Sequence, residues 1–191
     1  MRQSFHGHEE LVARLDEAVC SDCEETITGE VEQILTEMIQ KGALALPDDL
    51  KQPDGDAYAR RLLYQSEEHG YAVVAMIWGP NQGTALHDHD GVWCVEGVLE
   101  GTIEVTRYEP LERDAERWRF RPEKTITAKV GSSGSLIPPF EYHTIANGQQ
   151  DAPSVTVHIY GHELQKAHIF EPETPGADWY RRTVRDLGYT H

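Results

Sequence analysis

The chain has 191 residues, a length that fits one domain, and its 33 acidic against 17 basic residues give a net charge of −16 at pH 7. An acidic surface repels nucleic acids and anionic lipids, so neither is an expected partner. The apolar runs are all shorter than the roughly 20 residues of a membrane helix, and residues 1–10 lack the apolar core of a secretory signal. The three cysteines favour a reducing compartment, so we expect a cytoplasmic protein, either a monomer or a small homo-oligomer.

The first third of the chain has helical periodicity. Residues 9–19 place their apolar side chains on one stripe, and residues 29–42 repeat the pattern up to Gly42, which is typical of a helix C-terminus. After a turn marked by proline and glycine, we expect another short helix through Leu62 and Leu63. These elements form a predicted helical segment over residues 1–66.

After Tyr71 the pattern changes to short β-rich runs separated by Gly, Pro, Asn or Asp. The runs are YAVVAMIW, WCVEGVL, TIEVTRY, RWRFRP, KTITAKV, GSLIPPF, YHTIAN and PSVTVHIYG. Several short strands at even spacing predict a barrel or a sandwich. We therefore predict a single mainly β domain over residues 1–191, with a β-barrel over 70–170, helices packed against it and a C-terminal tail over 171–191.

Three histidines form a candidate metal site. His87 and His89 in HDH are two residues apart, so on a strand their rings would point to the same face. His143 follows a Pro-Pro turn and enters another strand. Three imidazole ligands leave coordination positions open for substrate and oxygen, and they suit Fe, Zn, Cu or Ni.

His158 lies in VTVHIYG and shares a strand face with Thr156 and Tyr160. Three roles are open for it: a fourth metal ligand, a hydrogen-bond partner for a residue beside the metal, or a core histidine.

Two motifs resemble the signatures of the cupin superfamily. In HDHDGVWCVEGVLEG, Cys94 occupies the position of the usual glutamate ligand, and Gly101 follows at the expected distance. PPFEYHTIAN resembles the second signature, with His143 and Asn147 in place and Phe140 where a glycine is usual. This resemblance implies a cupin double-stranded β-helix, a jelly-roll barrel, behind the N-terminal helical segment.

The cysteine at position 94, a WG pair upstream (Trp78 and Gly79) and VTVHIYG downstream are similar to the cysteine dioxygenase family of thiol dioxygenases. The resemblance implies an Fe(II) ion held by His87, His89 and His143. It also places Thr156 in the position of the serine of a serine–histidine–tyrosine pattern.

Some members of this family join the cysteine and the tyrosine through a thioether. The resemblance therefore allows a bond between Cys94 and Tyr160, although Cys94 could equally be a small buried apolar residue. Trp93 departs from the histidine that eukaryotic members with this cross-link carry before the cysteine.

The resemblance further implies a substrate-binding arginine in YARRLLY, because an arginine can bind a carboxylate in a two-pronged geometry. Matching R-x-L favours Arg60, whereas counting back from the next strand favours Arg61. Members that act on 3-mercaptopropionate have glutamine here. Trp78 and Thr156 are further candidates for substrate binding.

The implied reaction inserts both atoms of O2 into the sulfur of a small carboxylated thiol, with L-cysteine first among the candidates. Tyr160, His158 and Cys94 would be its catalytic residues. The alternatives are another thiol, such as 3-mercaptopropionate or mercaptosuccinate, another metal-cupin enzyme, or a metal cupin that binds a small ligand without oxygenase activity. A separate C-x-x-C, Cys20 and Cys23, is a weak zinc or redox signal, and two ordinary thiols explain it as well.

Overall fold

The structure is a computed structural model that describes residues 4–55, 57–115 and 117–190. It has the predicted mainly β fold, the cupin double-stranded β-helix, with two N-terminal helices, α1 (His8–Ala18) and α2 (Glu24–Gln40). A short 3-10 helix, η1 (Asp48–Lys51), connects the helices to the barrel. Neither α1 nor α2 is long and apolar enough to cross a membrane.

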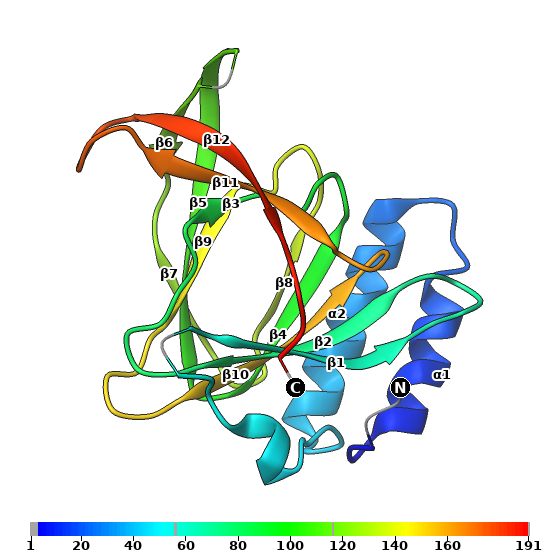
Figure 1. The fold of residues 1–191 in the computed structure, drawn as a ribbon. Helices are drawn as coiled ribbons and strands as arrows, with labels where there is room; N and C mark the ends of the chain where they lie inside the picture. Colours follow the sequence, from blue (N-terminus) through cyan, green and yellow to red (C-terminus); the bar gives the residue numbers. More distant parts are fainter. Residues whose placement is uncertain (1–3, 56, 116, 191) are drawn as a thin grey trace.

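Two sheets form the barrel (Figure 1). The five-stranded sheet has the order β1 (Ala59–Gln65), β2 (Ala72–Trp78), β10 (Ser154–Tyr160), β4 (Cys94–Glu100) and β8 (Ser133–Leu136). The seven-stranded sheet has the order β6 (Arg117–Pro122), β12 (Trp179–Asp186), β11 (Lys166–Pro172), β3 (Leu86–His87), β9 (His143–Asn147), β5 (Thr102–Asp114) and β7 (Ile126–Lys129). Strands β8 and β7 are therefore edge strands of different sheets.

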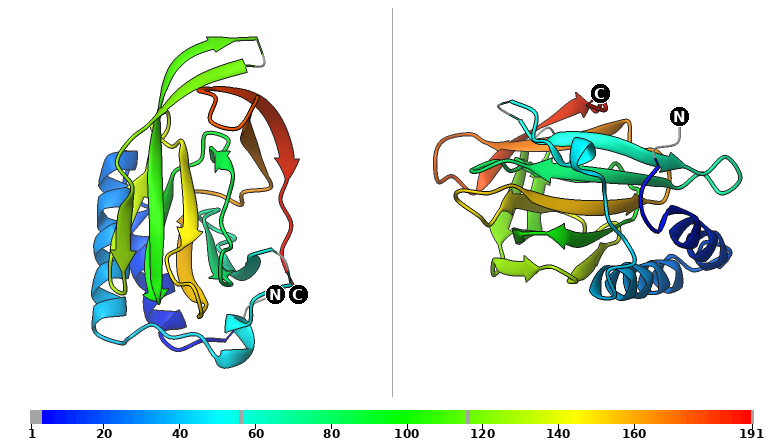
Figure 2. Two further views of the ribbon diagram at one scale, coloured as in Figure 1. Left: turned by 90° about the vertical axis from the view of Figure 1, so that its left-hand side faces the viewer. Right: turned by 90° about the horizontal axis from the view of Figure 1, so that it is seen from below.

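The helices cover the outer face of the five-stranded sheet (Figure 2). Alternate residues of β2 and β10, such as Val73 and Val157, pack against the helices. Their neighbours Val74 and Met76 point into the barrel, where they form a second apolar cluster. Both faces of β2 and β10 are thus buried, which explains why β2 is a continuous apolar run.

All eight strands that the sequence predicts after Tyr71 are confirmed. The turn between β4 and β5 depends on Gly101, which has a φ of +77°. A Cβ atom there would lie 2.3 Å from Ser154 Oγ, so a larger residue would clash as well as strain the backbone.

The predicted helix through Leu62 and Leu63 is wrong, because these residues lie in β1, paired antiparallel with β2. Pairing of β1 with β2 and burial of Leu63 in the core beside the helices outweigh the helix propensity of two leucines. The predicted C-terminal tail also differs, since residues 179–186 form β12 and pair with β11 and β6. The last described residues then return to β1, where the Thr190 amide donates to the Arg60 carbonyl at 2.6 Å.

Candidate metal centre and substrate cavity

The three histidines of the predicted metal site lie together inside the barrel. Their candidate ligand atoms are all within 4.8 Å of one another. The ring centroids of His87 and His143 are 4.3 Å apart, and those of His89 and His143 are 5.1 Å apart. His89 and His143 are buried and His87 is half-buried.

The sequence predicts that His87 and His89 lie on one strand, but the structure shows that they do not. Strand β3 contains only Leu86 and His87, and His89 lies in the loop that follows. The side chain of Asp88 fixes this loop, accepting from the His168 amide at 2.9 Å and the Asp90 amide at 3.1 Å. Glu141 accepts from the His89 amide at 3.0 Å.

Hydrogen bonds set the tautomers of two of the rings. The Nδ1 atom of His143 lies 2.7 Å from the Glu141 carbonyl, and that of His87 lies 3.1 Å from the Ala85 carbonyl. A carbonyl only accepts, so each Nδ1 carries the hydrogen and each Nε2 keeps its lone pair for a metal.

The histidine cluster is also uncharged. Burial lowers the pKa of His87, and burial together with neighbouring rings lowers the pKa of His89 and His143 well below the usual value. Metal ions bind neutral imidazole. Three neutral rings, two with a fixed tautomer, therefore fit a divalent transition-metal ion.

A cavity extends from this cluster towards β1 and the C-terminal segment. Besides the three histidines, its walls include Tyr58, Arg60, Met76, His158, Tyr160, Leu164, Arg185 and Leu187. A small molecule in this cavity would lie beside the histidine cluster.

Of the two candidate arginines, only Arg60 lines this cavity. It is 6% exposed, and its guanidinium donates to the carbonyls of Gly188 at 3.1 Å and Leu164 at 3.4 Å. The neighbouring Arg61 points the other way, as alternation along a strand requires, and donates to the Gln52 carbonyl. The structure thus separates two residues that the sequence left as alternatives.

The predicted catalytic residues lie beside the histidine cluster. Tyr160 packs edge-on against His89, with ring centroids 5.5 Å apart. His158 Nδ1 lies 3.4 Å from the Tyr160 hydroxyl and 3.9 Å from Cys94 Sγ. Its other nitrogen, Nε2, lies 2.8 Å from Thr156 Oγ1, so both ring nitrogens are engaged away from the cluster. This arrangement favours a hydrogen-bonding role for His158 over that of a fourth ligand.

Thr156 and Trp78 lie behind His158 and do not line the cavity of the histidine cluster, contrary to a role in contacting substrate. The Trp78 indole N–H donates to Thr156 Oγ1 at 2.9 Å. The Thr156 hydroxyl can in turn donate to His158 Nε2, and in that tautomer the hydrogen of His158 lies on Nδ1, facing Tyr160.

Sequence reasoning missed Arg185 and Tyr58, which line the cavity, and the segment 187–190 that packs over Arg60. The ring of Tyr189 lies 5.1 Å from the Arg60 guanidinium carbon. The segment WYRRTVRD has no regular alternation of polar and apolar residues, so the sequence gives no local signal for β12 or for Arg185 at the cavity. Cys20 and Cys23 are exposed free thiols.

Known proteins resemble this chain over the same region. The model of the family described as cysteine dioxygenase type I matches residues 49–173. The chain belongs to this family. Cysteine dioxygenase type 1 of Rattus norvegicus is 21% identical over 117 residues, which cover 61% of this chain and 57% of that protein. The Danio rerio protein of the same name is 23% identical over 118 residues, with the same coverage. The chain thus matches somewhat more than half the length of these relatives.

Two solved structures are also similar to part of the chain. TT1209 from Thermus thermophilus has a TM-score of 0.45 and 18% identity, covering 59% of this chain and 90% of that one. A double-stranded β-helix protein from Klebsiella pneumoniae has a TM-score of 0.46 and 18% identity, covering 59% and 79%.

Proposed function

We propose that this protein is a thiol dioxygenase that converts a small carboxylated thiol and O2 into the corresponding sulfinic acid, with L-cysteine as the first candidate substrate. One observation supports this most strongly. A cluster of three neutral histidines and a buried arginine line the same cavity, so a metal ligand set and a carboxylate anchor are within reach of one small molecule.

The cofactor in this proposal is Fe(II), held by His87, His89 and His143. Ferrous iron bound there would supply the redox chemistry that transfers both atoms of dioxygen to sulfur. The identity of the ion follows from the reaction, because zinc has no redox chemistry and the imidazole ligands alone do not choose the metal.

Arg60 orients the substrate in this scheme. Its two hydrogen bonds to the carbonyls of Gly188 and Leu164 fix the guanidinium plane and leave further N–H donors for the substrate carboxylate. Because these bonds fix the guanidinium before substrate arrives, little conformational entropy is lost when the carboxylate binds.

Tyr160 provides the hydroxyl next to the reacting atoms. His158 Nδ1–H donates to the Tyr160 oxygen, so the phenolic hydrogen is left to donate elsewhere. Its protein acceptor is Met76 Sδ at 3.9 Å, a weak and distant one, and a polar substrate atom beside the histidine cluster would be a better acceptor. Thr156 and Trp78 act through His158 as positioning residues.

Arg185 favours a second candidate substrate. Two arginines, Arg60 and Arg185, line the cavity, so a thiol with two carboxylates, such as mercaptosuccinate, would find a cation for each. 3-Mercaptopropionate has one carboxylate, so Arg60 alone would be enough to bind it. The other alternative is a binding protein without oxygenase activity.

Oxygen uptake by the Fe(II)-loaded protein, measured with cysteine, 3-mercaptopropionate, cysteamine and mercaptosuccinate in turn, tests the proposal. Uptake with one or more carboxylated thiols, and little with cysteamine, is expected. Lack of uptake with every thiol would favour the binding protein. The free thiols of Cys20 and Cys23 fit the cytoplasm as the proposed location.

A further inference from the structure

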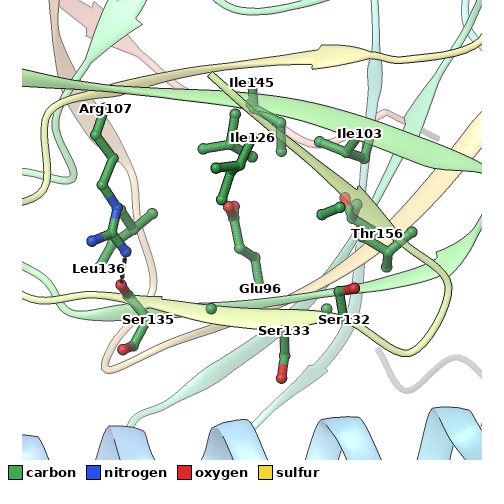
Figure 3. Close-up of a pocket in the computed structure, with 15 residues that line it drawn as sticks. Glu96, Ile103, Arg107, Ile126, Ser132, Ser133, Ser135, Leu136, Ile145 and Thr156 are labelled. Atoms are coloured by element: carbon green, nitrogen blue, oxygen red, sulfur yellow. Dashed lines mark hydrogen bonds between the residues drawn. The ribbon is translucent and has the colours of Figure 1, made fainter. Parts of the chain in front are cut away.

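A second cavity opens where the edge strands β7 and β8 meet (Figure 3). Its walls are mainly aliphatic, formed by Val98, Ile103, Val105, Ile126, Leu136 and Ile145. Among the described residues, Ile145 alone also lines the cavity of the histidine cluster. The space is therefore separate from the proposed active site, although both lie within the barrel.

A single carboxyl group, that of Glu96, points from β4 into the middle of this aliphatic cavity (Figure 3). Its side chain is 12% exposed, and its Oε2 atom is buried without a hydrogen bond among the described residues, with His158 Nδ1 3.5 Å away. Burial raises the pKa of Glu96 to about 7. A buried carboxyl oxygen without a partner costs free energy, so it needs a reason to be there.

Arg107 lies in the same cavity and donates to the Ser135 carbonyl at 3.0 Å (Figure 3). Its charge lowers the pKa of Glu96, which shows that the two groups act on each other electrostatically. Yet they form no ion pair within 4.0 Å in the part of the chain that the structure describes. The two groups therefore line one cavity without pairing with each other.

We propose that this cavity binds a small zwitterion, an α-amino acid with a branched aliphatic side chain. The ammonium group would bind Glu96, the carboxylate would bind Arg107, and the side chain would contact the aliphatic wall. A simple amine would leave Arg107 without a partner, and a fatty acid would do the same to Glu96. The empty space at this site, counted together with the open solvent at its mouth, is about 490 Å³.

The site is positioned to affect the histidine cluster through one residue. Glu96 Oε2 lies 3.5 Å from His158 Nδ1, the same atom that lies 3.4 Å from the Tyr160 hydroxyl. An ammonium group on Glu96 would therefore change the field at the His158 ring. Binding itself needs neither a metal nor a thiol, so it stands apart from the proposed function.

Isothermal titration of the metal-free protein at pH 8 tests the proposal with three probes: L-leucine, 3-methylbutylamine and 4-methylpentanoate. Leucine should bind, and each probe that lacks one charge should bind at least about tenfold more weakly. Glu96→Gln should weaken leucine and the amine about tenfold but leave the carboxylate unchanged. Arg107→Gln should weaken leucine and the carboxylate about tenfold but leave the amine unchanged. Glu104→Gln, which removes an exposed carboxyl from β5, is the matched control and should change nothing.

Methyl NMR of the unmodified protein shows where the amino acid binds, even if a variant fails to fold. Leucine should shift the methyl signals of Ile103 and Ile126 and leave that of Ile169, which lines the cavity of the histidine cluster. Leucine that produces no heat at millimolar concentration, binds Glu96→Gln as tightly as the unmodified protein, or shifts only Ile169 would overturn the proposal.

Discussion

Cys94 and Tyr160 are directly opposed residues of the antiparallel pair β4–β10, and both side chains point into the barrel. Directly opposed residues have Cβ atoms about 4.5–5.5 Å apart, which is within reach of a bond between a cysteine sulfur and a tyrosine ring. Burial raises the pKa of both groups well above their usual values, so both stay protonated. A bond between them therefore requires an oxidant.

We predict that Cys94 and Tyr160 form a thioether when the Fe(II)-loaded protein is incubated with a thiol substrate in air. Dioxygen is the oxidant, and the protein loses one hydrogen from the thiol and one from the ring. Intact mass spectrometry should show a loss of two hydrogen atoms that reducing agents do not reverse. Cys94→Ser and Tyr160→Phe should each abolish the change, whereas Cys20→Ser should retain it. An unchanged mass after many turnovers would contradict the prediction.

Arg60→Gln should raise KM for a carboxylated thiol by roughly tenfold to a hundredfold, because it removes charge-assisted hydrogen bonds worth about 1.5–3 kcal/mol. Steady-state oxygen uptake is the measurement. Arg61→Gln is the matched control, since Arg61 lies on the opposite face of β1, and it should change KM little. Equal effects of the two substitutions would show that Arg60 has no special role.

Arg185→Gln should change the choice of substrate. If Arg185 binds a second carboxylate, the substitution lowers kcat/KM for mercaptosuccinate by about tenfold or more and leaves kcat/KM for cysteine nearly unchanged. Competition between the two thiols in one reaction, with both sulfinates quantified, measures the ratio of their kcat/KM values directly. The same loss for both thiols would mean that Arg185 does not select between them.

Glu96→Gln should change how stability depends on pH. Because the pKa of Glu96 is raised to about 7 in the folded protein, the folded state holds its proton more tightly than the unfolded state does. The contribution of Glu96 to the free energy of unfolding is therefore fully present below the pKa that Glu96 has in the unfolded chain. This contribution is lost as the pH rises towards 7. The variant should escape this loss, which amounts to at most about 3 to 4 kcal/mol.

Urea denaturation of both proteins at pH 4.5 and pH 8 checks this prediction. The variant should gain stability relative to the unmodified protein on going from the lower to the higher pH. His158 and Arg107, the charged or titratable groups nearest Glu96, are present in both proteins, so their own effects cancel to first order. A difference that does not vary with pH would show that Glu96 has an ordinary pKa.

Much of the barrel could be predicted from the sequence because its strands are continuous or alternating apolar runs between turn residues. The metal cluster could be predicted because a histidine pair and a third histidine form recognisable motifs. Strand β1 was missed because adjacent leucines suit a helix as well as a strand, and only pairing with β2 decides between them.

The choice between Arg60 and Arg61 needed the strand register. The position of Glu96 depends on the pairing of β4 with β8, two strands that are far apart in the sequence. Such long-range relationships leave no local pattern to read.

The most direct test of the account is to measure iron content and sulfinate formation together, using ¹⁸O-labelled dioxygen and the four thiols named above. The account predicts stoichiometric iron in the unmodified protein and a sulfinate that carries two labelled oxygen atoms. It also predicts neither iron nor product in His87→Ala, while His162→Ala, which changes an exposed histidine, behaves like the unmodified protein. An active, iron-loaded His87→Ala variant, or an iron-loaded protein that oxidises none of the thiols, would contradict it.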